Sequence, residues 1–403
     1  MNCRWFAAAL TACFWFACTG EPVPSATAKV AAADAVATTD AATDATAKLG
    51  ADAATLPTRP DLAWDLAVPG PNGVGYRTFS YTYVPAAGDP TRTIGVNLWY
   101  PSPEKTGTLA LYMDFWPSKV AVVDAKAAPP TVAAGYPVLV YSHGYSGFGG
   151  SSPWLAEHFA SHGWVVIAPD HTGNMLPDND APKPTALWWW RARDVTAAID
   201  FVGTLADKAG LAGKPLLDKV ILGGHSFGGY TTLCLLGAKF DIAVVAAACK
   251  EGKGLGGACS EHDIQQYAAG LGDKRVVGGM LLQSGEGNSK WFGTLGMAAI
   301  AVPVFLITGD ADGGHLGPNQ WKTLQPIASI ANSLWVDVKK GCHQLLGLGK
   351  CGEVDEAEGL KITRTYTLAF ARRWLLGDMG QVTIDVLSGA LKVSELVTLH
   401  HGK

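Results

Sequence analysis

Apolar and polar positions follow no regular pattern over the first 58 residues, and a patterned region begins near residue 60. It opens with short runs of β-favouring residues, and 76–84 and 92–100 predict an antiparallel pair at the edge of a sheet. Continuous apolar runs follow, of the kind that is buried on both faces of a parallel sheet. We therefore expect further strands at 137–141, 164–168, 219–223, 242–247, 302–308 and 334–338.

Amphipathic stretches between these runs predict helices at 153–162, 187–204, 227–238, 320–331 and 358–375. Strands that alternate with helices predict a doubly wound, mostly parallel α/β sheet with helices on both faces. We expect this sheet to form one domain over residues 59–403. The Gly-rich segment 248–300 departs from the alternation and is a candidate lid over the site.

The first 58 residues predict an exported protein. Residues 1–18 carry Arg4 and then an apolar stretch too short to span a bilayer, as in an export signal. Cys13 and Cys18 are alternative lipidation sites of a bacterial envelope lipoprotein: Cys13 has the better local motif and Cys18 the better hydrophobic length. Cleavage without lipid, giving a secreted protein, stays open. Residues 19–58 contain few large apolar side chains, which predicts a disordered tether.

The composition indicates a globular protein that does not bind nucleic acid. The chain has 403 residues, of which 48% are hydrophobic and 16% charged, so it can bury a large core. Its formal charge is −4, and it has no basic block that could follow a phosphate backbone. We therefore expect no nucleic-acid partner, and we expect a monomer.

The hexapeptide GHSFGG at 224–229 carries the candidate nucleophile, Ser226. A buried strand is predicted directly before it and a helix directly after it, which is the strand, sharp turn and helix of a nucleophile elbow. The flanking glycines indicate a strained turn in which Cβ atoms would collide with neighbouring chain. This context predicts the α/β-hydrolase fold and a serine hydrolase.

A serine hydroxyl needs a base to accept its proton and an acid to orient that base. In this fold the acid and the base follow the serine in chain order, each after a later strand. Asp310 and Asp312 both follow the strand at 302–308; we prefer Asp312, with Asp310 as a loop cap. His343 follows the strand at 334–338 and is the candidate base, because His315 is too near the acid and His400 and His401 lie in a tail.

Two backbone N–H groups are candidates for the oxyanion hole, which stabilises the tetrahedral intermediate of ester hydrolysis. Phe227 directly follows the nucleophile. Tyr145 lies in the SHGYSG turn at 142–147, at the end of a central strand. We expect His143 to pack beneath that turn.

Several segments resemble the platelet-activating-factor acetylhydrolase and predicted dienelactone hydrolase branch of the α/β-hydrolases. They include DPTR at 89–92, LWYP at 98–101, YSHG at 141–144, ASHGW at 160–164, Arg193-Asp194 and GHSFGG. The resemblance implies hydrolysis of short-chain carboxylic esters, a Ser-Asp-His triad and no cofactor. Bacterial cutinase-type polyester hydrolases are similar too, although they carry Met where this chain has Phe227. Ser226 argues against true dienelactone hydrolases, which use cysteine.

Two pairs of cysteines are candidates for local disulfides in an exported protein. Cys249 and Cys259 flank a Gly-rich loop, and Cys342 and Cys351 flank the His343 loop. Free or metal-bound cysteines are the alternative, but paired ligand spacing for zinc is absent. We expect no metal site, and we expect Cys234 to be a buried free thiol.

Three consecutive indoles, Trp188 to Trp190, cover all sides of a helix start, so we expect at least one to be exposed, where it could grip an apolar acyl chain or a lipid surface. Core and loop packing is the alternative for most of them. Two classes of function then stand. The first is an esterase acting on a small-molecule or lipid-like ester, with a polyester or lipid hydrolase as its variant. The second is a non-catalytic envelope lipoprotein that uses a hydrolase fold as a binding module.

Overall fold

The central strands are apolar on both faces, and this places a hydrophobic core on each side of the sheet. In β5, Val138 and Val140 belong to one buried cluster, whereas Leu139 and Tyr141 belong to the other. Side chains alternate between the faces of a strand, so each central strand supplies both cores. The parallel strands are β5 (Val138–Ser142), β6 (Val165–Asp170), β7 (Val220–His225), β8 (Val276–Leu282), β9 (Val304–Gly309) and β10 (Leu334–Val338).

The computed structural model describes Leu62 and residues 64–132, 134–254, 256–284, 290–312, 321 and 332–402. These residues belong to one compact unit, Thr58–Lys403. The predicted export signal, Cys13, Cys18, the tether, His315 and the helix expected at 320–331 lie outside the described residues, apart from Trp321. No helix in the described ranges combines the length and the apolarity of a membrane span.

Within these ranges eleven strands form one sheet, in the order β11-β10-β9-β8-β7-β5-β6-β2-β1-β4-β3. The strands outside the parallel centre are β1 (Gly73–Tyr83), β2 (Arg92–Ser102), β3 (Leu109–Tyr112), β4 (Trp116–Val123) and β11 (Val397–His401). β1 and β2 are antiparallel, as expected. The prediction that they form the edge of the sheet is wrong, because β4 pairs with β1, and β3 pairs with β4 and forms the edge. His400 and His401 likewise lie in β11, paired with β10, and not in a free tail.

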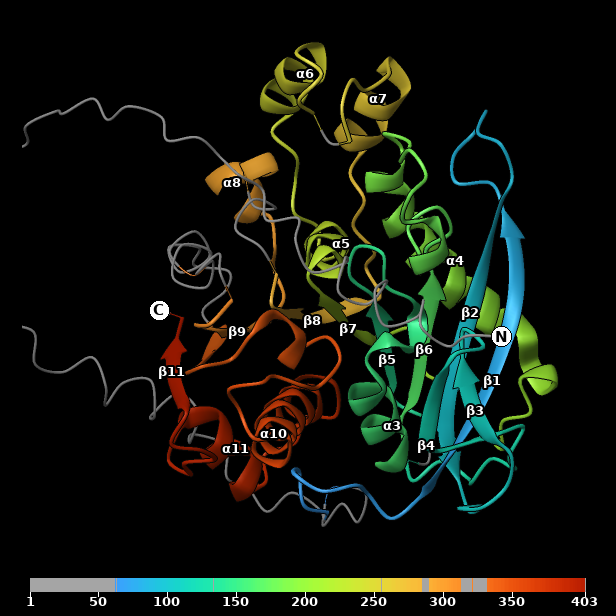
Figure 1. Ribbon diagram of the computed structural model, residues 1–403, viewed down its shortest axis with the longest axis vertical. Helices are drawn as coiled ribbons and strands as arrows, with labels where there is room; N and C mark the ends of the chain where they lie inside the picture. Colours follow the sequence, from blue (N-terminus) through green and yellow to red (C-terminus); the bar gives the residue numbers. More distant parts are fainter. Residues whose placement is uncertain are drawn as a thin grey trace, which may run out of the picture. The chain divides into compact units, whose positions relative to one another are not determined.

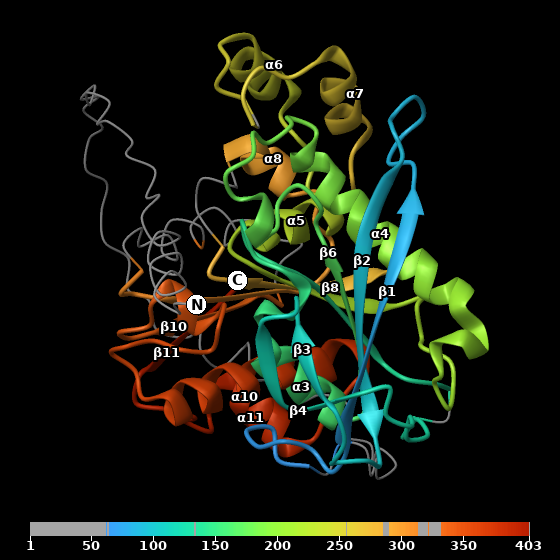
Figure 2. The same ribbon diagram turned by 45° about the vertical axis from the view of Figure 1, so that its right-hand side comes forward.

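Helices cover both faces of the sheet, which confirms the predicted doubly wound class. Figures 1 and 2 show α4 (Leu187–Leu205) and α5 (Phe227–Leu235) on one face, and α3 (Pro153–Ser161), α10 (Glu356–Leu375) and α11 (Gln381–Ser388) on the other. The apolar side chains of α4 and α5 join the cluster of Val138, and those of α3 and α10 join the cluster of Leu139.

The prediction of a strand at 242–247 is wrong. These residues form the start of α6 (Ile242–Lys250), whose first turn is capped by Asp241 Oδ1, 3.1 Å from the Val244 N–H. A short apolar run does not distinguish a buried strand from a helix, and here the alanines and the cap favour the helix.

The strand that pairs with β7 is instead β8, inside the segment expected to be a lid. Gly278 and Gly279 obscured it, although a side chain at either position would crowd a neighbouring side chain. A Cβ on Gly278 would lie 3.0 Å from Ile221, and one on Gly279 would lie 2.5 Å from Leu236. The rest of that segment includes α7 (Glu261–Ala269) and α8 (Gly293–Met297), and α6 and α7 stand together at one end of the domain (Figure 1).

Candidate active site

Ser226 occupies a strained turn between β7 and α5. Its backbone angles are φ 54° and ψ −114°, outside the regions that side-chain-bearing residues favour. The Ser226 N–H donates to Leu282 O of β8 at 2.9 Å, which holds the turn against the neighbouring strand. A Cβ on Gly224 would collide with Gly228 O, and one on Gly228 would collide with Ser142 O. The sequence GHSFGG therefore folds into the sharp turn that its glycines predict.

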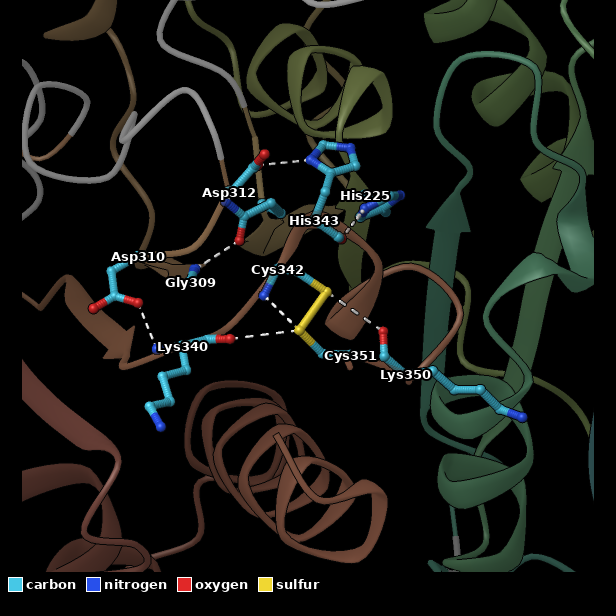
Figure 3. Close-up of a disulfide and its surroundings, with 10 residues drawn as sticks. His225, Gly309, Asp310, Asp312, Lys340, Cys342, His343, Lys350 and Cys351 are labelled. Atoms are coloured by element: carbon cyan, nitrogen blue, oxygen red, sulfur yellow. Dashed lines mark hydrogen bonds and ion pairs between the residues drawn. A yellow bond between two sulfur atoms is a disulfide. The ribbon is translucent and has the colours of Figure 1, made fainter. Parts of the chain in front are cut away.

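Asp312 and His343 meet in front of the carboxyl ends of β9 and β10. His343 Nδ1 donates to Asp312 Oδ2 at 2.7 Å, as Figure 3 shows. His343 opens a short 3₁₀ helix, His343–Leu345, and its side chain is 37% exposed, so the ring is only partly covered by the domain. Asp310 is exposed and accepts a hydrogen bond from the Lys340 N–H instead. Of the two carboxylates left open by the sequence, Asp312 is the one that contacts the histidine.

Gln283 fixes the carboxylate of Asp312 and was missed by the sequence analysis. Its side-chain N–H donates to Asp312 Oδ2 at 2.7 Å, and its side-chain oxygen accepts from the Gly309 N–H at 2.7 Å. Burial opposes ionisation of Asp312, but the hydrogen bonds from His343 and Gln283 outweigh it and lower the pKa of Asp312. Gln283 follows β8 directly, so recognising that strand would have pointed to it.

His225 connects the elbow to the loop of the candidate base. Its Nε2 donates to His343 O at 3.0 Å, and the two imidazole rings are 4.7 Å apart (Figure 3). Burial, together with the neighbouring His343, lowers the pKa of His225 to about 3, so the ring is neutral. Because His225 precedes Ser226 in the chain, this contact brings the loop of His343 to the side of the elbow.

The turn that carries Tyr145 lies against the elbow. A Cβ on Gly144 would lie 3.1 Å from His225 Nδ1 and 3.4 Å from Ser226 Cβ. Gly144 O accepts from His143 Nδ1 at 2.7 Å and from the Gly147 N–H at 3.1 Å. In a trans peptide the carbonyl and the following N–H point in opposite directions. The Tyr145 N–H is therefore directed away from the buried ring of His143.

His143 packs beneath this turn, as expected. It is fully buried, and its Nε2 accepts from the His171 N–H at 3.1 Å. The ring proton must therefore be on Nδ1, where it donates to Gly144 O. Burial lowers the pKa of His143 well below its usual value, which keeps the ring neutral.

A second Ser-His-Asp chain lies behind the turn. Ser142 Oγ and His171 Nε2 are 2.9 Å apart, and His171 Nδ1 and Asp194 Oδ2 are also 2.9 Å apart. These hydrogen bonds have the connectivity of a catalytic triad, but all three side chains are fully buried, so no substrate can reach Ser142. Asp194 also accepts two hydrogen bonds from Arg92, at 2.6 and 2.8 Å. These hydrogen bonds join β2, β5 and α4 behind the turn.

An aromatic cluster surrounds Phe227. Trp188 contacts the Phe227 ring edge-on at 4.5 Å, and the Tyr145 ring lies 6.1 Å away. Trp188 and Trp190 are half-buried and Trp189 is fully buried, so the expectation of an exposed indole is wrong. The physical reason is the covering segment around α7: Trp189 Nε1 donates to Asp263 at 2.8 Å, and a Cβ on Gly256 would lie 3.1 Å from the Trp188 ring.

The predicted cysteine pairs are disulfides in the structure. Cys249 is joined to Cys259, and Cys342 to Cys351, with Cα atoms 5.0 and 5.7 Å apart. The second bond closes the loop that begins directly before His343 (Figure 3). Cys234 is buried and free. Among the described residues no group of three or more His, Cys, Asp or Glu side chains is placed to hold a metal ion.

Comparison with solved structures identifies the fold. A ferulic acid esterase from Streptomyces cinnamoneus aligns with 83% of this chain and 98% of its own, with a TM-score of 0.53 and 20% sequence identity. This protein has the α/β-hydrolase fold. In an α/β-hydrolase the loops after the parallel strands carry the site, and here Ser226, Asp312 and His343 all lie on such loops.

Comparisons of sequence find similarity to a chlorophyllase family model and to cutinases. A family model described as chlorophyllase matches residues 118–248. Cutinase est2 of Thermobifida alba is 36% identical over 107 residues, which is 27% of this chain and 32% of the relative. Cutinase 2 of Thermobifida cellulosilytica is 35% identical over 109 residues, which is 27% and 37% respectively.

The chain thus spans about a third of the length of the curated relatives it matches. These matches confirm the predicted similarity to cutinases. They do not test the resemblance to the acetylhydrolase branch, which stays a prediction.

Proposed function

We propose that this chain is a serine hydrolase that cleaves carboxylic esters through an acyl-enzyme. The observation that carries the proposal is the hydrogen bond between Asp312 and His343, on two loops that meet beside the strained turn of Ser226. A histidine oriented by a carboxylate, next to a serine on a sharp turn, is the arrangement that turns a hydroxyl into a nucleophile. The similarity to cutinases supports the same class of reaction.

In the proposed mechanism, Ser226 Oγ attacks the ester carbonyl carbon while His343 Nε2 accepts the hydroxyl proton. Asp312 holds the ring through Nδ1 and stabilises the imidazolium. The N–H groups of Tyr145 and Phe227 donate to the oxyanion. His343 then protonates the leaving alcohol. Water next attacks the acyl-enzyme carbonyl while His343 accepts its proton, and His343 returns that proton to Ser226 Oγ as the acid leaves. No cofactor takes part.

The substrate is proposed as a small-molecule ester, with a polyester or lipid-like ester as the second candidate. The cutinase matches favour the second candidate, whereas the aromatic cluster of Tyr145, Phe227 and Trp188 suits an apolar acyl group in either case. The two disulfides support export, because such bonds persist in oxidising compartments. The export signal, the tether and lipidation at Cys13 or Cys18 remain proposals, and so does a monomeric state.

The test is hydrolysis of p-nitrophenyl esters from acetate to palmitate by the full chain and its Ser226→Ala variant. We expect the variant to lose at least about 10⁴-fold in kcat, because no other group replaces the nucleophile. A fluorophosphonate should label the native chain, and the adduct should map to Ser226 and not to the buried Ser142. The chain-length profile then separates small esters from lipid-like ones. A native chain that neither hydrolyses any ester nor takes the label would instead support a non-catalytic binding module.

A further inference from the structure

We propose that Arg191 is a positioning residue of the oxyanion hole, joining the turn that carries Tyr145 to the helix that begins at Phe227. This inference rests on the proposed esterase function. It concerns a side chain in α4 that does not touch substrate.

The guanidinium of Arg191 contacts both halves of the candidate oxyanion hole. It donates to His143 O, two residues before Tyr145. Its Cζ lies 4.5 Å from the centre of the Phe227 ring, and its Nε donates to Thr231 Oγ1 of α5 at 3.1 Å. A rigid, planar group with several donors is suited to hold two separate segments in one geometry.

The contacts of Arg191 control peptide orientation in the Tyr145 turn. With His143 O held by Arg191 and Gly144 O held by His143, two consecutive peptide planes have fixed carbonyl directions. The Tyr145 N–H belongs to the second of these planes, so its direction is fixed too. Without Arg191, the carbonyl of His143 would lose its partner, and the turn could rotate.

Arg191 also brings a positive charge, and none of the carboxylates among the described residues forms a salt bridge with it. Its hydrogen-bond acceptors are neutral: His143 O, Ser142 Oγ, Asn174 Oδ1 and Thr231 Oγ1. The nearby carboxylate, Asp194, is paired with Arg92 and hydrogen-bonded to His171 and Tyr83. Burial lowers the pKa of Arg191 to about 9, which still leaves it charged at neutral pH.

A buried cation that has no salt bridge among the described residues is costly to a fold. The charge of Arg191 can instead stabilise the reaction intermediate. The charges of Arg92 and Asp194 offset each other, and the buried His143 and His171 are neutral, so the cluster behind the turn carries a net positive charge. A positive charge fixed behind the oxyanion donors favours the tetrahedral intermediate over the neutral ester.

The test compares Arg191→Met with Arg372→Met in the full chain. Arg372 is a matched control: it is 2% exposed, and it donates to the backbone carbonyls of Leu62 and Trp64 from α10, on the other face of the sheet. For Arg191→Met we expect kcat on p-nitrophenyl acetate to fall about 10²-fold with KM unchanged, as for loss of an oxyanion donor. The inhibition constant of a trifluoromethyl ketone, whose adduct carries an oxyanion, should rise by a similar factor.

For Arg372→Met we expect a lower melting temperature with kcat within about threefold of the native value. If Arg191→Met does not fold, Arg191→Lys serves the same comparison: it keeps the charge but not the planar contacts, so it should show a smaller loss in kcat, again without a change in KM. Equal kcat losses in the Arg191 and Arg372 variants, or a kcat unchanged by either Arg191 substitution, would overturn the inference. An inactive and unlabelled native chain would overturn the proposed function instead.

Discussion

Asp310 and Asp312 follow the same strand two positions apart, and yet their partners are unrelated. Asp310 accepts from the backbone of Lys340, whereas Asp312 accepts from His343 and Gln283. Chemically the two side chains are identical, so the difference lies in where the loop directs each of them. At the scale of single residues, the role of a carboxylate here depends on the donor that it faces.

This difference can be tested with two matched variants. Asp312→Asn should lower kcat on the order of 10⁴-fold, because an amide cannot hold the imidazole in the required tautomer or stabilise its charge. Asp310→Asn should leave kcat within about threefold, because an amide oxygen can still accept from the Lys340 N–H. Steady-state kinetics on one short-chain ester suffice. The opposite ranking would assign the acid to Asp310.

The loop closed by Cys342 and Cys351 is the element that presents the candidate base. Two hydrogen bonds lie within it: the Cys342 N–H points to Cys351 Sγ at 3.0 Å, and the Gly349 N–H donates to Gln344 O at 3.0 Å. The rest of the domain is contacted through His343 and through Gly347 O, which accepts from Ser152 and Trp154. The other disulfide joins Cys249, near the end of α6, to Cys259, shortly before α7. The two cross-links close loops of nearly equal length, with sequence separations of 9 and 10.

Replacing each cysteine pair by serine therefore separates stability from catalysis. Loops of this size predict a similar loss for both double variants, about 2 to 3 kcal/mol in the free energy of unfolding. Only Cys342→Ser/Cys351→Ser should also lower kcat, by about tenfold, because the His343 loop gains freedom. Urea unfolding and p-nitrophenyl acetate kinetics measure the two effects. A kcat that is unchanged in this variant, or reduced equally in both, would contradict a role of the disulfide in holding the base.

At the scale of the whole domain, the structure buries imidazoles on both faces of the sheet. Among the described residues, the histidines with strongly lowered pKa values are His143, His158, His162, His171 and His225. For each of them burial is the main cause, because the charged ring loses its hydration. The pKa is about 4 for His162 and about 3 for His171 and His225, so these rings stay neutral while the domain is folded.

Acid should therefore unfold this domain at a moderately low pH. A lowered pKa in the folded state gives stability that is complete above the unfolded pKa near 6.5 and is lost as the pH falls below it. Each such histidine should cost about 1 kcal/mol of stability between pH 6.5 and 5.5. We expect the melting temperature to be level above pH 7 and to fall steeply below 6.5. Calorimetry in two buffers should show an uptake of several protons on unfolding at pH 5.5; no uptake there would contradict the burial of neutral histidines.

The sequence by itself determined those strands and turns that depend only on residues adjacent in the chain. The apolar runs specified the parallel strands, apart from the stretch at 242–247 and the glycine-containing β8, because burial on two faces requires continuous apolar sequence. The turn of Ser226 was also predictable: its glycines and its flanking strand and helix are neighbours in sequence, and collisions at Gly224 and Gly228 leave few alternatives. The α/β-hydrolase fold follows from these features together.

Contacts between distant segments were decided only by the tertiary structure. Gln283 and Asp312 are 29 positions apart in the chain, Asp312 and His343 are 31 apart, and Arg191 and His143 are 48 apart. Each of these pairs is hydrogen-bonded in the structure. Such contacts depend on how each loop leaves its strand and on which helix covers it, and neither leaves a mark in local periodicity. For the same reason the sequence alone identified Ser226 and His343 as candidates, but it left two carboxylates open and missed Gln283 and Arg191. Packing across the sheet brings Gln283, Asp312 and His343 together and brings Arg191 to the turn that carries Tyr145.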